Sequence, residues 1–228
     1  MQVCVVGTGY VGLVTGVCLS YLGHSVTCVD IDERKVKMLS EGKSPIYEPG
    51  LEQLLAICKQ KEELSFTTDI AGAVKEADII FIAVGTPPLP SGRANLSFVE
   101  AVARSIGAAL EPGKRRVVVN KSTVPIGSGN WVDMLVREGL ESNTACQGHK
   151  AETLFAVASN PEFLREGSAI ADTFYPDRIV LGSFDSFAIE QLRTLYKPLV
   201  EQTFNPPPST ARPAGFTGAS GSGSRCAA

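Results

Sequence analysis

The chain has 228 residues, of which 44% are hydrophobic and 20% are charged, and its formal net charge is −3. These values are typical of a globular protein with one or two domains and argue against a disordered or fibrous chain. The Lys and Arg residues form no basic run, which argues against a nucleic-acid-binding protein. No apolar run approaches the roughly 20 residues that span a bilayer, and no positively charged segment precedes the first one. The sequence therefore predicts a cytoplasmic protein without membrane contact.

Apolar runs typical of strands alternate along the chain with segments of helical apolar spacing. The predicted strands cover residues 2–6, 25–30, 64–67, 78–84, 115–123, 154–159 and 177–182. The predicted helices cover residues 10–22, 32–41, 50–59, 97–110, 127–140 and 185–199, and Asp185 is placed to cap the last one. Because the strands are continuously apolar, they predict a mostly parallel sheet with both faces covered, in a doubly wound α/β fold.

The apolar periodicity stops near residue 200. The residues that follow are rich in Pro, Gly, Ser, Thr and Ala, a composition typical of flexible low-complexity segments. We therefore expect one domain over residues 1–200 and a disordered tail over residues 201–228.

The six cysteines form no CxxC pair and no metal-binding spacing. Cys4, Cys18 and Cys28 fall on predicted strands or on a helix face. We expect buried free thiols and no metal site.

The sequence GTGYVG at residues 7–12 follows the first predicted strand and opens the first predicted helix. In that context a GxGxxG motif is typical of a dinucleotide-binding turn. Gly7 permits the tight turn, Gly9 lets the backbone approach a pyrophosphate, and Gly12 lets the helix pack closely. The N–H groups at the start of the helix are then available to the phosphates. A turn without a binding role would not need a preceding strand, a following helix and an acidic residue at the end of the next strand.

That acidic residue is Asp30, which ends the second predicted strand 18 residues after Gly12. A carboxylate there is expected to hydrogen-bond the adenosine ribose hydroxyls, and its charge repels a 2′-phosphate. Arg34 is a nearby cation that argues for NADP, but Asp32 and Glu33 stand beside it. The sequence therefore predicts NAD as the cofactor.

Polar side chains follow three consecutive predicted strands, at the edge where parallel sheets bind their ligands. The segments are VGTPP at residues 84–88, NKSTVP at residues 120–125 and SNPEFLREG at residues 159–167. Their Thr and Asn side chains fit either a binding role or ordinary turns at strand ends.

Glu162 and Glu166 in the third segment are four residues apart. If a helix starts at Pro161, both carboxylates lie on one face of it. The spacing leaves two interpretations open. One is acid–base catalysis by a carboxylate in a dry pocket, and the other is an acidic first turn that complements the helix dipole.

Six longer segments resemble the UDP-glucose/GDP-mannose dehydrogenase family, in the family's order and over about residues 1–200. They are VVGTGYVGLVTG, VDIDERKVKML, GKSPIYEPGLEQLL, ADIIFIAVGTP, VVNKSTVPIG and SNPEFLREGSAIADTFYPDRIVLG. The resemblance implies a Rossmann-type NAD-binding domain in an enzyme that oxidises a nucleotide-sugar alcohol to a carboxylate by two hydride transfers to NAD. UDP-glucose, oxidised to UDP-glucuronate, is the favoured substrate, and GDP-mannose and UDP-N-acetylmannosamine are alternatives.

The resemblance also assigns roles position by position. The cofactor-binding residues that it implies are Gly7, Gly9, Tyr10, Val11, Gly12, Asp30, Lys35, Thr86, Thr123 and Glu166. The catalytic residues that it implies are Thr123, which would orient a water, Glu162, the family's catalytic glutamate, and Glu166 on the nicotinamide side. The substrate-binding residues that it implies are Glu162, Phe163, Leu164 and Arg165.

The sequence departs from the family pattern in two respects. Asn95 stands where the family has Asp, and Asn can still cap the following helix. Nothing in residues 1–228 matches the family's central helix with its catalytic Lys and Asn, its nucleophilic Cys segment or its sugar-nucleotide domain. Cys226 follows GASGSGSR but lacks the expected Phe-Pro-Lys-Asp continuation.

We therefore expect a fragment that binds NAD without turnover. Family members form homodimers through the central helix, which nothing in this sequence matches, so the oligomeric state stays open. The alternative is a non-catalytic NAD-binding module that works with a separate chain.

Overall fold

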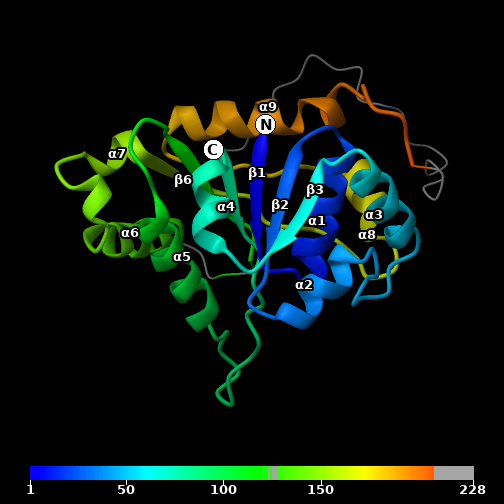
Figure 1. Cartoon of the computed structure of the whole chain (residues 1–228), viewed down its shortest axis with the longest axis horizontal. Coiled ribbons are helices and arrows are strands. Elements are labelled where there is room, and N and C mark those ends of the chain that lie inside the picture. Colours follow the sequence, from blue (N-terminus) through cyan, green and yellow to red (C-terminus); the bar gives the residue numbers. More distant parts are fainter. Residues whose placement is uncertain (123, 125–127, 208–228) are drawn as a thin grey trace.

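The sheet is built from six parallel strands within residues 1–122, 124 and 128–207, which are the residues that the computed structural model describes. The strands are β1 (Gln2–Val6), β2 (Ser25–Val29), β3 (Leu64–Thr67), β4 (Ile79–Ile82), β5 (Arg116–Asn120) and β6 (Phe155–Ser159). Their order is β3-β2-β1-β4-β5-β6, and every pairing is parallel (Figure 1). The predicted parallel sheet is confirmed, and its order reverses between β1 and β4, where such sheets bind ligands.

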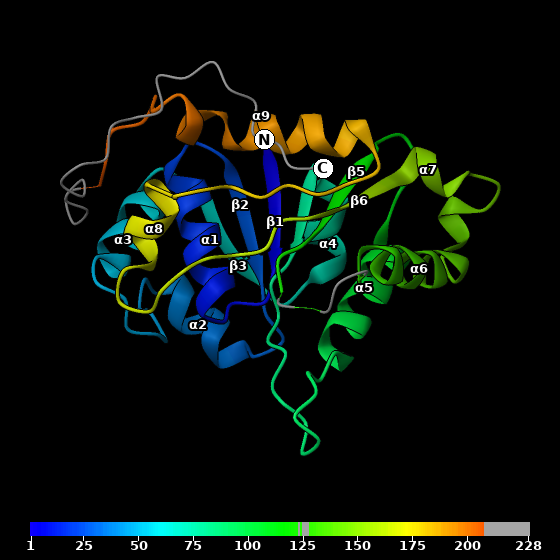
Figure 2. The same ribbon diagram turned by 180° about the vertical axis from the view of Figure 1, so that it is seen from behind.

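Helices cover both faces of the sheet (Figure 2). They are α1 (Tyr10–Tyr21), α2 (Glu33–Ser40), α3 (Leu51–Gln60), α4 (Ile70–Glu76), α5 (Ser97–Ala109), α6 (Ser128–Glu141), α7 (Ala151–Leu154), α8 (Ala169–Phe174) and α9 (Ser186–Val200). Side chains of α1, α3, α8 and α9 share one apolar cluster with one face of the sheet, and those of α4, α5 and α6 share a second cluster with the other face. No helix among the described residues is long and apolar enough to cross a membrane.

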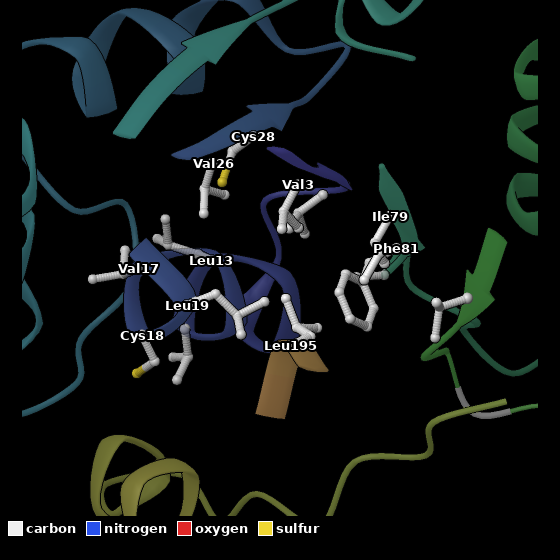
Figure 3. Packing of buried hydrophobic residues seen from close by; sticks show 14 of the residues in the cluster. Val3, Leu13, Val17, Cys18, Leu19, Val26, Cys28, Ile79, Phe81 and Leu195 are labelled. Carbon is white, nitrogen blue, oxygen red and sulfur yellow. The ribbon is translucent and has the colours of Figure 1, made fainter. Parts of the chain in front are cut away.

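Strand residues alternate between the two clusters, because successive side chains of a strand point to opposite faces. In β1, Val3 and Val5 belong to the first cluster, and Cys4 and Val6 belong to the second. Figure 3 shows side chains of β1, β2, β4, α1 and α9 together in the first cluster. Burial on both faces explains why the strands are continuously apolar.

The predicted free thiols are confirmed for Cys4, Cys18, Cys28, Cys58 and Cys146, which are buried and unpaired. Burial raises the pKa of the Cys4 thiol to about 12, so the group stays protonated at neutral pH. Cys226 lies outside the described residues.

The chain stays packed against the core beyond the end of α9. The ring centroid of Phe204 lies 5.2 Å from that of Phe174 and 6.4 Å from that of Tyr175. The described chain is therefore part of the folded body at least as far as Phe204.

The cap predicted at α9 is confirmed, whereas the N-cap of α5 is Leu96, which makes no side-chain capping hydrogen bond, and Asn95 lies one residue before it. The Asp185 carboxylate accepts a hydrogen bond from the Phe187 N–H at 2.9 Å, at the start of α9. The Asn95 side chain accepts from the Ser97 N–H at 3.1 Å, at the start of α5. Both contacts satisfy backbone donors that the first helical turn leaves unpaired.

The strand predicted over residues 177–182 is wrong. The segment pairs with β6 only through one antiparallel bridge, between Gly182 and Ser159. Ile179 and Leu181 pack against the first apolar cluster instead. The apolar run thus reflects burial of a segment against the core, which the sequence does not distinguish from pairing in a sheet.

The helix that would start at Pro161 does not form. The N–H of Leu164 donates to the Glu162 carboxylate at 2.7 Å, and the N–H of Arg165 donates to the Asp172 carboxylate at 3.0 Å. Side-chain acceptors therefore occupy N–H groups that a helix would direct to backbone carbonyls. The next helix, α8, begins only at Ala169.

Candidate cofactor and substrate site

The glycine turn, residues 7–12, is closely packed at both ends and open in the middle. Gly7 has a φ of +103°, and its N–H donates to the Val29 carbonyl at 2.8 Å. A Cβ at Gly12 would lie 1.9 Å from the Gly7 carbonyl oxygen, whereas a Cβ at Gly9 would have no atom within 4 Å. Gly9 is also the N-cap of α1. The turn therefore leaves space for a phosphate next to the unpaired N–H groups of α1.

Asp30 lies directly after β2 and faces the glycine turn. Its Oδ2 accepts hydrogen bonds from the Thr8 N–H at 2.9 Å and the Thr8 hydroxyl at 2.6 Å, and its Oδ1 accepts from the Asp32 N–H at 3.0 Å. The Lys35 ammonium is 3.8 Å from Oδ2. Burial raises the pKa of Asp30, but these hydrogen bonds and the Lys35 charge outweigh it, and the pKa lies below its ordinary value.

Asp30 is thus an anion at neutral pH, held in place beside the turn. A carboxylate has about four acceptor sites, and the three hydrogen bonds leave Oδ1 able to accept another donor. A ribose hydroxyl is such a donor. The open space at Gly9 and the carboxylate of Asp30 therefore fit a dinucleotide such as NAD.

Two other predicted cofactor residues lie in the first turn of α1 and in the loop after β4. Val11 is half-buried in the first turn of α1. Thr86 is half-buried in the loop between β4 and α5, which extends from the carboxyl end of the sheet (Figure 1). Thr123 lies outside the described residues. The cofactor contacts of these residues stay predictions.

A cavity of about 910 Å³ lies beside the ends of β5 and β6, where α1, α8 and α9 meet. Ligand pockets commonly have volumes of about 300–1,000 Å³. All four predicted substrate-binding residues, Glu162, Phe163, Leu164 and Arg165, line it. The structure thus brings these residues together, whereas neither the glycine turn nor Asp30 is part of the lining.

The two glutamates of the acidic segment, residues 162–167, differ in their exposure to solvent and in their position relative to the cavity. Glu162 is half-buried and lines the cavity, whereas Glu166 is exposed and does not. Arg165 pairs with Asp172, with 2.6 Å between Nη2 and Oδ1. The ring of Phe163 lies 4.6 Å from the guanidinium carbon of Arg178. Of the two glutamates, Glu162 is therefore the one that lines the cavity.

Residues 1–200 match the model of the UDP-glucose/GDP-mannose dehydrogenase family, NAD binding domain. The chain belongs to this family. Its cofactor is therefore NAD, as the glycine turn and Asp30 predicted.

The chain resembles complete members of the family over less than half of their length. It is 46% identical over 200 residues to UDP-glucose 6-dehydrogenase of Pseudomonas aeruginosa and 47% identical over 199 residues to UDP-glucose 6-dehydrogenase YwqF of Bacillus subtilis. These matches cover 88% and 87% of this chain but 42% of each relative. A crystal structure of a ternary complex of GDP-mannose dehydrogenase from P. aeruginosa has a TM-score of 0.80 at 42% identity, covering 86% of this chain and 44% of that one.

One part of the family domain that the sequence reasoning missed is a buried polar cluster at the cavity. The Asn160 Oδ1 accepts hydrogen bonds from the Lys121 ammonium at 3.2 Å and from the Tyr196 hydroxyl at 2.5 Å. Its amide nitrogen donates to the Val180 carbonyl at 2.9 Å. Burial lowers the pKa of Lys121 to about 8, and the charge of Glu162 opposes this shift. One indication of this cluster is present in the sequence: Lys121 and Asn160 directly follow β5 and β6, at the edge where parallel sheets bind ligands.

A second missed residue is Glu48, which is 6% exposed. Its carboxylate accepts hydrogen bonds from the Tyr10 hydroxyl, from the Gly167 N–H at 2.8 Å and from the Ile170 N–H at 3.3 Å. The contact therefore joins the glycine turn to the end of the acidic segment. Nothing in the local pattern around YEPG predicts it.

The described residues contain no group of three or more His, Cys, Asp or Glu side chains arranged to hold a metal ion.

Proposed function

We propose that this chain forms the cofactor-binding part of a dehydrogenase that oxidises the primary alcohol of a nucleotide sugar to a carboxylate, with UDP-glucose as substrate. Membership of the family and the identities of 46% and 47% to two UDP-glucose 6-dehydrogenases support the proposal. Because the chain spans 42% of the length of those relatives, the complete reaction and its substrate are part of the proposal.

The observation that carries the proposal is the line of residues from Glu162 to Arg165 along a cavity of about 910 Å³. Oxidation of the primary alcohol to an aldehyde releases a hydride from carbon and a proton from oxygen. Oxidation of the aldehyde to the carboxylate then takes up a water and releases a second hydride and two protons, and one NAD accepts the hydride in each step. Glu162, half-buried in this lining, is placed to take up the proton, directly or through a water. Phe163 and Leu164 supply apolar contacts, and Arg165 stays paired with Asp172 at the edge.

Calorimetric titration with NAD and NADP tests the cofactor half of the proposal. The wild-type chain is expected to bind NAD more tightly than NADP, because the Asp30 anion repels a 2′-phosphate. Asp30→Ala removes a charged acceptor and should weaken NAD binding by about tenfold or more, since such hydrogen bonds contribute roughly 1.5–3 kcal/mol. Glu33→Gln removes one negative charge from an exposed neighbouring position and should leave the affinity unchanged. Equal affinity of Asp30→Ala and wild type for NAD would contradict the assigned role.

Two chimeras test the substrate. Residues 1–200 of this chain replace the matching part of the P. aeruginosa UDP-glucose 6-dehydrogenase in one and of the P. aeruginosa GDP-mannose dehydrogenase in the other. NADH absorbance should rise with UDP-glucose in the first chimera and stay flat with GDP-mannose in the second. Glu162→Gln should lower kcat in the active chimera, whereas Glu52→Gln, an exposed change, should not.

GDP-mannose is the second candidate substrate, because the GDP-mannose dehydrogenase structure shares a TM-score of 0.80 with this chain. Activity of the second chimera alone would favour it. If the chain binds NAD but neither chimera forms NADH, the non-catalytic NAD-binding module becomes the better assignment.

A further inference from the structure

Glu48 is a buried carboxylate whose hydrogen-bond donors come from two distant parts of the chain. Its partners are the Tyr10 hydroxyl, at the start of α1, and the N–H groups of Gly167 and Ile170, which lie 119 and 122 residues away in the sequence. No Lys or Arg forms an ion pair with Glu48 within the part of the chain that the structure describes. Burying an unpaired carboxylate is costly unless donors surround it, so these three hydrogen bonds are required for its burial.

The three groups form a closed arrangement. The Tyr10 hydroxyl donates to Glu48 and accepts from the Gly167 N–H at 3.0 Å. The same N–H also donates to Glu48, at 2.8 Å. Burial and the hydrogen bond to Glu48 raise the pKa of the Tyr10 hydroxyl to about 12, so it keeps its proton at neutral pH. A shift of any one of the three groups therefore disturbs both of the others.

This arrangement connects the two candidate binding regions. Tyr10 is the first residue of α1 and part of the glycine turn, the proposed site of the cofactor. Gly167 ends the acidic segment, and its φ of +85° holds the backbone in a conformation that favours glycine. Ile170 lies in the first turn of α8, one of the helices that border the cavity. Glu48 itself lies outside both regions, in the loop before α3.

We infer that Glu48 is a positioning residue that couples occupancy of the glycine turn to the order of the acidic segment. The inference rests on the proposed function, because it takes NAD as the ligand of the turn. A bound cofactor restricts the motion of α1 at Tyr10, and the hydroxyl of Tyr10 then holds the Glu48 carboxylate in one position. The carboxylate holds the N–H groups of Gly167 and Ile170, so residues 162–170 open less often when the turn is occupied.

Hydrogen exchange of the full chain, followed by mass spectrometry with and without saturating NAD, tests the coupling. In the wild type, NAD should slow exchange in peptides covering residues 7–12 and, by about fivefold, in peptides covering residues 162–170, the effect of one hydrogen bond of ordinary strength. Glu48→Gln should still bind NAD and protect residues 7–12, but the NAD-dependent protection of residues 162–170 should be lost. Glu52→Gln, an exposed change in the same region, should behave as the wild type does.

Tyr10→Phe provides a second test that keeps the buried carboxylate and its two backbone hydrogen bonds. It should also lose the NAD-dependent protection of residues 162–170 at saturating NAD, so the coupling can be judged if Glu48→Gln fails to fold. A purely structural role of Glu48 predicts faster exchange of residues 162–170 with and without NAD, and an unchanged response to NAD.

Three results separate the possibilities. NAD-dependent protection of residues 162–170 that persists in Glu48→Gln and Tyr10→Phe would overturn the inference and favour direct contact of Glu166 with the cofactor. Protection of residues 7–12 alone in the wild type would overturn the inference but leave NAD binding intact. Absence of protection in both regions would overturn the proposed NAD binding, and the inference with it.

Discussion

Gly12→Ala is expected to destabilise the protein because the new Cβ has no room. It would lie 1.9 Å from the carbonyl oxygen and 3.0 Å from the carbonyl carbon of Gly7, and both are backbone atoms. Gly7 cannot easily move away, since its φ is +103° and its N–H is bound to the Val29 carbonyl. Overpacking of this kind costs roughly 1–3 kcal/mol, and we take the upper value because backbone must shift. A gain of about 1 kcal/mol from replacing Gly by Ala in a helix offsets part of it, which leaves a loss of about 2 kcal/mol.

Gly9→Ala is the matched control in the same turn. A Cβ at Gly9 would have no atom within 4 Å, and its φ of −68° suits alanine. The unfolding free energy should therefore stay equal or rise by about 0.5 kcal/mol. NAD affinity should fall by at least about tenfold, because the methyl group would occupy the space through which a pyrophosphate approaches the N–H groups of α1.

Urea denaturation followed by circular dichroism measures the first effect, and calorimetric titration with NAD measures the second. The two variants should separate stability from binding: Gly12→Ala lowers the unfolding free energy, and Gly9→Ala lowers the affinity alone. An unfolding free energy of Gly12→Ala within about 0.5 kcal/mol of the wild type would refute the steric argument. Unchanged NAD affinity in Gly9→Ala would refute the placement of the phosphate at this turn.

Three further predictions concern the buried polar contacts and one helix cap. Burial lowers the pKa of Lys121 from 10.5 in the unfolded chain to about 8 in the folded protein. Below pH 8 the folded protein therefore bears the full free-energy cost of a buried charge, and this cost disappears as the pH rises from 8 to 10.5. Relative to Lys121→Met, the wild type should gain roughly 3 kcal/mol of unfolding free energy over that interval, measured by urea denaturation at several pH values. Tyr196→Phe removes one donor to Asn160 and should lower the unfolding free energy by about 1 kcal/mol in the same assay. Asp185→Ala removes the cap of α9 and should lower the melting temperature, because the unfolding free energy falls by about 1 kcal/mol. Asp185→Asn keeps a capping oxygen and loses only the ion pair with Arg115, so the unfolding free energy should fall by only a few tenths of a kcal/mol.

The sequence predicts those features whose causes are local. The runs at residues 2–6 and 64–67 became β1 and β3 with the predicted bounds. In β1 the apolar run follows from burial of Val3 to Val6 on both faces, whereas in β3, an edge strand, only Leu64 is buried. The glycine turn also follows from local backbone geometry, since only glycine tolerates the φ of Gly7 and the close contact at Gly12. By contrast, the short apolar run at residues 177–182 is equally compatible with a strand and with an irregular segment packed on the core, and the structure has the second.

The sequence does not predict the buried polar contacts, because the residues that form them are far apart in the chain. Asn160 meets Lys121 and Tyr196 across 39 and 36 residues, and Glu48 meets Gly167 across 119. No spacing rule connects positions so far apart. A sequence motif shows that a polar residue ends a strand, but it does not show which other element brings the partner.

The acidic segment shows how these remote contacts decide the chemistry. The spacing of Glu162 and Glu166 argued for one shared face, but only on the condition that Pro161 starts a helix. Without that helix, the segment runs between two fixed points: Asn160, held at one end by Lys121 directly after β5 and by Tyr196 of α9, and Gly167, held at the other by Glu48 and Tyr10. A turn at residues 166–168, in which Gly167 has a φ of +85°, separates the two carboxylates, so Glu162 lines the cavity before the turn while Glu166 is exposed within it. The separate environments of the two carboxylates, and with them the proposal that Glu162 takes up the proton, therefore depend on contacts that lie outside the motif itself.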